Sequence, residues 1–193
     1  VDEPHKGKVD LGAILNNPYA KPDGKVTFDP AAQYNFELEK TLDEKVLLKK
    51  CSRAIASGEK TRFSVDVKNT DRAFGTILGA EITRNHKNGL PEDTVVIDCN
   101  GAGGQSFGAF IPKGLTLKLT GDCNDYFGKG LSGGKLILKT PENAGYRAED
   151  NIIVGNVALY GATSGTVFIN GMAGERFAVR NSGANAVVEG VGE

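Results

Sequence analysis

The sequence lacks most of the residues on which catalytic and metal sites depend. It has no tryptophan, two histidines and three cysteines among 193 residues. Cys51, Cys99 and Cys123 show no C-x-x-C spacing, and His5 and His86 lie outside any metal-ligand pattern. A catalytic triad, an H-E-x-x-H zinc sequence and a Walker loop are also missing. We therefore expect no catalytic residue, no bound metal and no cofactor in this chain, and cysteines that are buried as small apolar side chains.

The sequence also lacks an excess of charge of one sign and any long apolar run. Its 23 basic and 24 acidic residues give a formal net charge of -1. No apolar stretch approaches the roughly 20 residues that span a bilayer, and no charged-then-apolar leader stands at the start. We therefore expect neither nucleic acid nor a membrane as a partner. The unpatterned cysteines favour a reduced, cytoplasmic location, and the absence of an initial Met indicates a fragment or a processed chain.

Regular patterns begin only after residues 1–35. Four prolines interrupt any period in that stretch, which predicts an extended N-terminal arm or linker. Such an arm has no core of its own and would cross the surface of something larger.

One amphipathic helix is predicted within residues 36–60, near 41–57. Thr41 and Glu44 have the spacing of a capping box, apolar residues recur at helical intervals after them, and Gly58 offers a stop. The apolar stripe needs a surface to cover, so we expect this helix to cap one end of the β structure that follows.

Short β-branched runs recur at a nearly fixed interval in residues 61–193. Their steps are 21, 20, 31 and 20 residues, and an insertion in the polar stretch 140–150 accounts for the long step. The five runs are TVVID from Thr94, LTLKL from Leu115, KLILK from Lys135, TVFIN from Thr166 and AVVEG from Ala186.

Other segments predict further short strands. Residues 63–67 alternate apolar and polar side chains, and residues 74–83 form a second β-like run. Weaker β segments lie between the repeats: SFGAF at Ser106, YFG at Tyr126, NIIVGNVALYG from Asn151 and RFAV at Arg176.

A unit of about 20 residues with two or three short strands cannot bury its apolar side alone. Units stacked about 4.8 Å apart form parallel ladders around a continuous core. The repeats therefore predict an all-β fold, a single-stranded parallel β-helix or β-solenoid, over residues 61–193. Alternation along the strands predicts inward rows made of Val95, Ile97, Leu115, Leu117, Leu136, Leu138, Val167 and Ile169.

Glycine is the most informative residue type, because 22 of the 26 glycines follow residue 60. Sharp corners between strands favour glycine, which adopts positive φ and has no side chain. Twelve glycines are assigned to structural corners: Gly101, Gly103, Gly104, Gly128, Gly130, Gly133, Gly134, Gly161, Gly165, Gly171, Gly174 and Gly183.

Two apparent chemical signals have structural explanations. The stretch from Gly128 to Gly133 matches the dinucleotide fingerprint G-x-G-x-x-G, but strand-forming residues follow it, so no helix N-terminus is available for a pyrophosphate. Five carboxylates could face one another as general acids, yet solvated corners explain them better. They are Asp98, Asp122, Asp125, Glu149 and Asp150.

Several long stretches resemble one known family. They are NTDRAFGTILGAEITR at 69–84, GAGGQSFGAF at 101–110, GKGLSGG at 128–134, NIIVGNVALYGATSG at 151–165 and GERFAVRNSGANAVVEGVG at 174–192. In this order they resemble the C-terminal GXGXG domain of the glutamate synthase large (alpha) subunit. The resemblance implies a right-handed β-helix that carries no catalytic residue and no cofactor.

In that family the large subunit also has a glutamine amidotransferase domain and a synthase domain with FMN and an iron–sulfur cluster. The resemblance implies that this chain holds those domains in register, so that ammonia released at one site reaches 2-oxoglutarate at the other. The expected partners are the other domains of the large subunit, and FMN and the cluster are expected elsewhere in the parent enzyme. A plastid location follows if the parent is a plant or algal enzyme.

Two alternatives stay open. A stand-alone relative, similar to the β-helix subunit of formylmethanofuran dehydrogenase, would be an assembly scaffold in a different enzyme. Parallel β-helices also serve polysaccharide lyases and hydrolases, although this chain has no Trp to stack on sugar rings.

The coil that begins at Ala186 leaves an unpaired edge. We therefore expect self-association through the C-terminal edge or contact with another domain of the parent enzyme.

Overall fold

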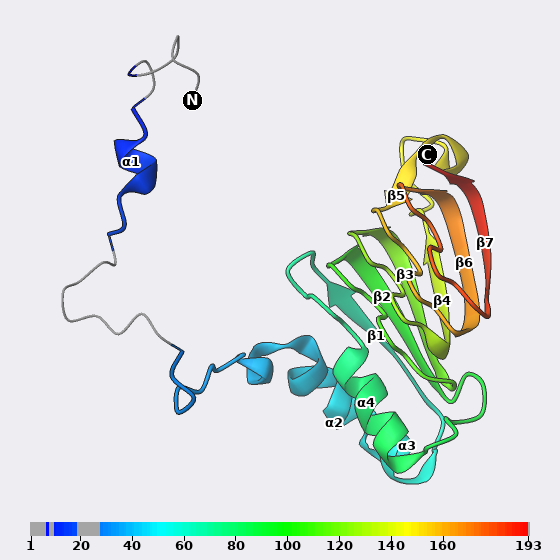
Figure 1. Cartoon of the computed structure of the whole chain (residues 1–193). Coiled ribbons are helices and arrows are strands. Elements are labelled where there is room, and N and C mark those ends of the chain that lie inside the picture. The colour runs from blue at the N-terminus through cyan, green and yellow to red at the C-terminus, as the bar shows by residue number, and fades with distance from the viewer. Residues whose placement is uncertain (1–6, 8–9, 19–27, 193) are drawn as a thin grey trace. The chain divides into compact units, whose positions relative to one another are not determined.

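The computed structural model describes residue 7, residues 10–18 and residues 28–192 (Figure 1). The chain divides into two compact units, residues 1–36 and residues 37–193. The sheet and its flanking helices belong to the second unit.

The first unit has little regular structure among its described residues. Gly12–Leu15 form the single turn α1, and Asp10 Oδ1 accepts a hydrogen bond from Gly12 N–H at 2.8 Å. The turn buries none of its residues, and Ile14 is exposed. The extended arm predicted for residues 1–35 falls partly on residues outside the described ranges, as does His5.

Helical turns follow one another where one capping helix is predicted. They are the 3-10 turn η2 (Leu38–Lys40), the π-helical turn η3 (Asp43–Leu47), α2 (Leu48–Lys50) and α3 (Ser52–Ser57). Glu44 N–H donates to Thr41 Oγ1 at 3.3 Å, as the capping box predicts, and Gly58 ends α3 with φ 72°. The apolar stripe of this run packs into the hydrophobic core.

Residues 74–83, predicted as a β run, form a helix instead. Helix α4 spans Thr76–Asn85, and its buried residues Leu78 and Ile82 lie four positions apart, which is the spacing of one helix face. Gly75, with φ 87°, turns the chain into the helix. The β prediction was wrong: the run has the spacing of a helix face, and two amides at its start donate hydrogen bonds to a carboxylate from another segment, a contact that no pattern within the run reveals.

Seven strands form one sheet among the described residues, and every pairing between them is parallel (Figure 1). The strands are β1 (Thr61–Val67), β2 (Val95–Gly103), β3 (Leu115–Cys123), β4 (Ser132–Lys139), β5 (Ile152–Val154), β6 (Ser164–Ala173) and β7 (Ala184–Val191). Their order is β1-β2-β3-β4-β6-β5, with β7 also paired to β6 and one β3 to β5 contact. The 3-10 turn η4 (Ala148–Asp150) lies between β4 and β5. The fold is therefore mostly parallel β structure with few helices, as predicted.

The recurring β-branched runs are strands of this sheet. Val95 pairs with Leu115 and Lys135 pairs with Thr166, so successive repeats stack in register. The polar stretch 140–150 leaves the sheet after β4. Strand β4 precedes this stretch and β6 follows it, yet the two strands pair directly with each other. The insertion therefore accounts for the long step of the repeat, as predicted.

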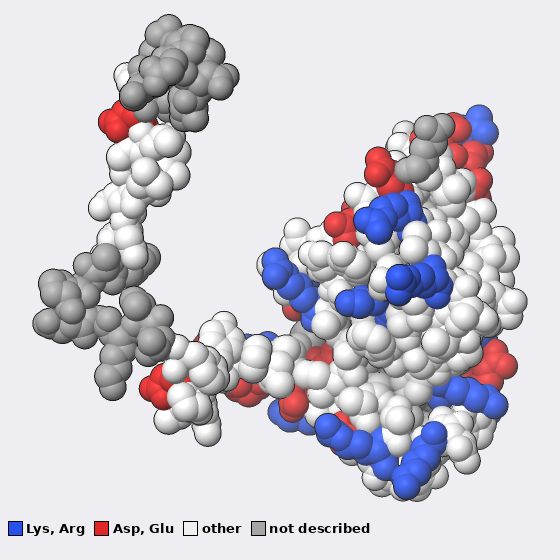
Figure 2. All heavy atoms as spheres, in the orientation of Figure 1, with Lys and Arg blue, Asp and Glu red and all other residues white. Residues whose placement is uncertain are grey.

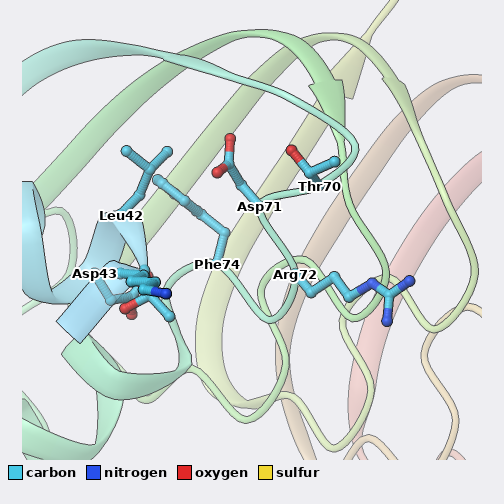
Figure 3. A pocket seen from close by; sticks show the side chains of 8 residues that line it. Leu42, Asp43, Thr70, Asp71, Arg72 and Phe74 are labelled. Atoms are coloured by element: carbon cyan, nitrogen blue, oxygen red, sulfur yellow. The ribbon is translucent and has the colours of Figure 1, made fainter. Parts of the chain in front are cut away.

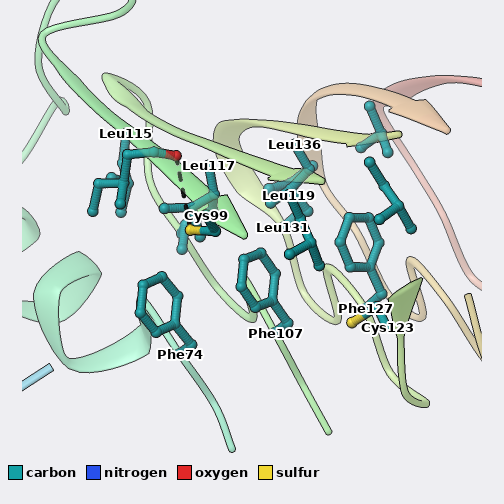
Figure 4. Packing of buried hydrophobic residues seen from close by; sticks show 14 of the residues in the cluster. Phe74, Cys99, Phe107, Leu115, Leu117, Leu119, Cys123, Phe127, Leu131 and Leu136 are labelled. Atoms are coloured by element: carbon teal, nitrogen blue, oxygen red, sulfur yellow. Dashed lines mark hydrogen bonds between the residues drawn. The ribbon is translucent and has the colours of Figure 1, made fainter. Parts of the chain in front are cut away.

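The predicted inward rows form the core. All eight side chains are 3 % exposed or less: Val95, Ile97, Leu115, Leu117, Leu136, Leu138, Val167 and Ile169. Three aromatic rings stack alongside them (Figure 4). Phe74 and Phe107 have ring centroids 5.1 Å apart, and Phe107 and Phe127 have centroids 6.0 Å apart, with each pair nearly parallel. The stack runs from one corner to the next, as the strand ladders do.

The weaker β segments between the repeats are mostly turns. Only β5 forms a strand there, while the segments at 106–110, 126–128 and 176–179 lie in bends and turns. The strand prediction for these three segments was wrong. Alternate residues in them have positive φ.

Candidate functional site

Stacked corners form a second hydrogen-bonded ladder beside the sheet. In four successive corners every second residue has φ between 55° and 68°: Ser106, Gly108, Phe110; Tyr126, Gly128, Gly130; Val157, Leu159, Gly161; Arg176, Ala178, Arg180. Ser106 N–H donates to Asp125 O in the next corner at 2.9 Å, whereas Gly108 N–H donates to Phe74 O in the preceding corner at 2.9 Å. Alternate amides thus bind the two neighbouring corners, which fixes the stacking of the repeats.

This corner ladder holds bulky residues in a conformation that L-amino acids avoid. The left-handed region costs roughly 1–2 kcal/mol for each non-glycine residue, and the β-branched Val157 is the extreme case. The hydrogen bonds between corners and the burial of intervening side chains such as Phe107 and Phe127 offset this cost. Glycine relieves the strain at some of these positions, including Gly128 and Gly130.

Arg180→Gly is expected to raise the free energy of unfolding by roughly 0.5–1 kcal/mol, because glycine adopts the left-handed conformation without the steric cost. Arg180 is exposed and has φ 58°. Arg72→Gly is the matched control, since Arg72 is an exposed corner residue without positive φ and its replacement should gain nothing. Urea unfolding followed by circular dichroism measures both variants. A loss of stability in Arg180→Gly would show that the contacts of the Arg180 side chain contribute more to stability than the relief of backbone strain does.

The twelve glycines assigned to corners fall into two groups. Seven have positive φ: Gly101, Gly128, Gly130, Gly133, Gly161, Gly165 and Gly171. At the other five a Cβ would lie 2.3 to 2.8 Å from a neighbouring atom: Gly103, Gly104, Gly134, Gly174 and Gly183. Several of the twelve, such as Gly101 and Gly171, lie inside strands rather than between them. Strand β4 follows Gly128 and Gly130, so the dinucleotide-like spacing precedes a strand and not a helix.

Asp43 is a buried carboxylate that sequence reasoning missed. It is 2 % exposed, its Oδ1 accepts from Gly75 N–H at 2.8 Å and its Oδ2 accepts from Leu78 N–H at 3.0 Å. These amides lie at the N-terminus of α4, where the helix dipole favours negative charge. Burial raises the pKa of Asp43 and outweighs the hydrogen bonds, which lower it. Asp43 therefore ties η3 to α4 at the end of the core.

A small recess of about 210 Å³ opens beside Asp43 (Figure 3). Leu42, Asp71 and Phe74 line it, while Arg72 extends away from the others in this view. Asp43 already binds two backbone amides, and Asp71 Oδ2 accepts from Lys68 N–H at 2.8 Å. Both carboxylates of the recess therefore hold backbone in place.

The five carboxylates considered as candidate acids do not gather into one cluster, although Glu149 and Asp150 are neighbours. Asp98 on β2 pairs with an arginine of β1, and Asp125 Oδ1 accepts from a backbone N–H of the next corner at 2.8 Å. Glu149 and Asp150 contact one arginine of their own loop, and Asp122 is exposed. Within the part of the chain that the structure describes, no three His, Cys, Asp or Glu side chains gather as a metal ion would require.

The three cysteines are buried and unpaired, as the sequence predicts. Burial raises the pKa of Cys51 to about 12, and it also raises the pKa of Cys99 and of Cys123. The thiols therefore stay protonated near neutral pH and act as apolar packing. His86 has a local role as well, because its Nε2 lies 2.8 Å from Ile55 O.

Acidic and basic side chains are interspersed over the face of the second unit that Figure 2 shows. Ion pairs on its surface include Arg62 with Asp98 and Lys135 with Glu92. None of the helices in the described ranges has the length and apolar character to cross a membrane.

Stacked parallel repeats, a second ladder at the corners and side chains engaged in packing define the molecule as a repeat protein built from short β units. The chain belongs to the GXGXG motif family, whose pattern matches residues 43–193.

The chain is similar to segments of much longer proteins. It is 50 % identical over 187 residues to the glutamate synthase [NADPH] large chain of Bacillus subtilis, covering 96 % of this chain and 12 % of that protein. It is 45 % identical over 197 residues to the glutamate synthase [NADH] of Schizosaccharomyces pombe, covering 100 % of this chain and 9 % of that protein. The ferredoxin-dependent glutamate synthase 2 of Synechocystis is 50 % identical over 125 residues, 65 % of this chain and 8 % of that protein. The chain therefore spans only about a tenth of these relatives.

Proposed function

We propose that this chain is the non-catalytic β-helix domain of a glutamate synthase large subunit. It positions the glutamine amidotransferase domain and the FMN and iron–sulfur synthase domain, so that ammonia released from glutamine reaches 2-oxoglutarate. The observation that carries the proposal is the 50 % identity to the Bacillus subtilis large chain over 96 % of this chain. The matched segment is 12 % of that protein, which leaves ample length for domains that hold the active sites.

The names of the relatives support a role away from the electron donor. They specify NADPH, NADH and ferredoxin, yet the identity to this chain stays at 50, 45 and 50 %. A segment specialised for one donor would be expected to match the relatives that use that donor better than the others. This uniformity favours a structural role, which is common to all of them.

We further propose that the parallel sheet and its corners form the coils of a right-handed single-stranded β-helix. Two ladders advance together, with Val95 paired to Leu115 in the sheet and Ser106 bound to Asp125 in the corners. A unit of about 20 residues fixed at both places cannot slide against its neighbour. Such a rod suits a scaffold that keeps two active sites at a constant separation.

The relatives do not favour the alternative of a formylmethanofuran dehydrogenase subunit, because those described above are glutamate synthases. A reducing compartment, the cytoplasm or a plastid, suits three buried free thiols. Among the described residues β7 pairs only with β6, and Val187 and Val191 on it are exposed. Self-association through this edge stays a prediction.

The purified chain is expected to bind neither FMN nor an iron–sulfur cluster, and to show neither glutaminase nor glutamate synthase activity. The buried thiols carry raised pKa values, whereas a cluster is held by thiolates. An absorption spectrum after anaerobic reconstitution with FMN, iron and sulfide measures this. A stoichiometric flavin or cluster band would overturn the non-catalytic assignment.

A further inference from the structure

Phe110 is an exposed aromatic residue of the corner ladder. Its side chain is 53 % exposed and its φ is 60°. The ring lies against the backbone of the next corner, where a Cβ on Gly130 would stand 2.3 Å from Phe110 Cε1. The equivalent positions in the next two corners are Gly130 and Gly161, so the ladder itself does not require an aromatic residue here.

Two hollows flank the Phe110 ring. The first, of about 370 Å³, is lined by α4 residues that include Gly79 and Arg84. The second, of about 590 Å³, is lined by residues that include Gly89 and Ser132. Phe110 and Thr83 border both hollows. The two hollows together, divided by this ring, are called the Phe110 groove.

The Phe110 groove carries positive charge and no carboxylate among its lining residues. Arg84 pairs with Glu81, which lies outside the lining. Lys87 and Lys113 have no ion-pair partner within residues 28–192. An exposed aromatic ring between two hollows, with cations beside it, fits a protein segment that presents an apolar side chain and a carboxylate.

We propose that the Phe110 groove docks a segment of the parent polypeptide that lies outside this chain. An apolar side chain of that segment fills a hollow beside Phe110, and a carboxylate pairs with Lys87 or Lys113. This inference rests on the proposed function, since it names the surface through which the scaffold holds another domain. The matched segment is 12 % of the Bacillus subtilis large chain, so the rest of such a chain would be a covalently linked partner. Covalent linkage raises the effective concentration of the partner segment.

The first step of the test separates folding from docking in the isolated chain. Phe110→Gly introduces the residue found at the equivalent positions 130 and 161, so the urea midpoint is expected to stay unchanged or to rise. A fall in the midpoint would show that Phe110 serves the fold, and it would overturn the proposal. Lys87→Glu with Lys113→Glu provides a second variant that leaves the backbone of the ladder untouched.

The second step uses the complete Bacillus subtilis large chain with this chain in place of its matching 187 residues. Hydrogen exchange of residues 76–89 and 105–114 is expected to slow at least tenfold relative to the isolated chain. Phe110→Gly and the double lysine reversal should each abolish most of this slowing. Lys118→Glu, a reversal on β3 outside the Phe110 groove, is the matched control and should leave it in place.

The outcomes separate the two proposals. Slowing confined to other surfaces of the chain would overturn the Phe110 groove as the docking site and leave the scaffold function standing. No slowing anywhere in the chain would overturn both. Slowing at the groove that survives both variants would show that neither the ring nor the lysines hold the partner, which also overturns the inference.

Discussion

Asp43→Ala is expected to lower the free energy of unfolding by about 2–4 kcal/mol. The substitution leaves the Gly75 and Leu78 amides without an acceptor in a buried place, because the Asp43 carboxylate is 2 % exposed. It also removes a negative charge from the N-terminus of α4. Loss of this contact should release η3 and α4 from each other, so the end of the core loses its cover.

Urea unfolding at neutral pH measures the effect of Asp43→Ala. Asp71→Ala is the matched control, because Asp71 also accepts one backbone hydrogen bond but lies nearer the surface, and its loss should cost about 0.5–1.5 kcal/mol. Equal losses in the two variants would contradict the anchoring role of Asp43.

The pKa of Asp43 gives the same contact a pH dependence of known sign. Burial raises this pKa above its ordinary value, so the folded state binds the proton more tightly than the unfolded state does. Stability from this group is therefore greatest below about pH 4, the ordinary range of the carboxyl, and falls as the pH rises through the raised pKa. In Asp43→Asn this dependence should vanish. The unfolding free energy of the native chain minus that of Asp43→Asn should accordingly decrease as the pH rises.

The sequence predicts the strands well because their inward-facing residues alternate with a simple period, and the same pattern recurs in several strands. Runs such as 95–97 and 115–117 alternate in the way that a pleated strand requires, and the register aligns them from one strand to the next. Their burial then follows from packing alone.

The corners could not be predicted in the same way, because buried and exposed side chains alternate in them with the same two-residue period as in a strand. In residues 106–110 the side chains of Phe107 and Ala109 are buried, whereas those of Ser106 and Phe110 are less so, which is also the pattern of a short strand. The backbone instead alternates between left-handed and other conformations. A period of two residues in side-chain direction does not distinguish these two backbones.

Helix α4 and the Phe110 groove escaped prediction for a related reason. Two amides at the start of the helix donate hydrogen bonds to Asp43, which lies more than thirty residues earlier in the chain, and local patterns carry no trace of that contact. Helix α4 forms one wall of the Phe110 groove. The prediction of a strand at 74–83 therefore could not include this groove.

Gly121→Ala is expected to cost about 3 kcal/mol or more, the largest effect of any substitution considered for the sheet. Gly121 has φ 147° within β3 and pairs with Gly101 of β2. A Cβ on Gly121 would stand 1.8 Å from Gly101 O, which is backbone and cannot move aside without disturbing β2. One added methyl group must therefore either break the pairing of β2 with β3 or displace the backbone of β3 at Gly121.

Two other glycines separate the clash from the loss of conformational freedom. Gly161 has φ 63° but open space where a Cβ would lie, so Gly161→Ala should cost only roughly 1 kcal/mol from backbone strain. Gly145, in the loop after β4, has neither positive φ nor a close neighbour, and Gly145→Ala should be neutral or slightly stabilising. Urea midpoints of the three variants are expected to rank Gly121→Ala far below Gly161→Ala, and Gly161→Ala below Gly145→Ala. If the urea midpoint of Gly121→Ala fell no further than that of Gly161→Ala, a small shift must relieve the close approach of β3 to Gly101, and the two strands would be packed less tightly at this pair than the register implies.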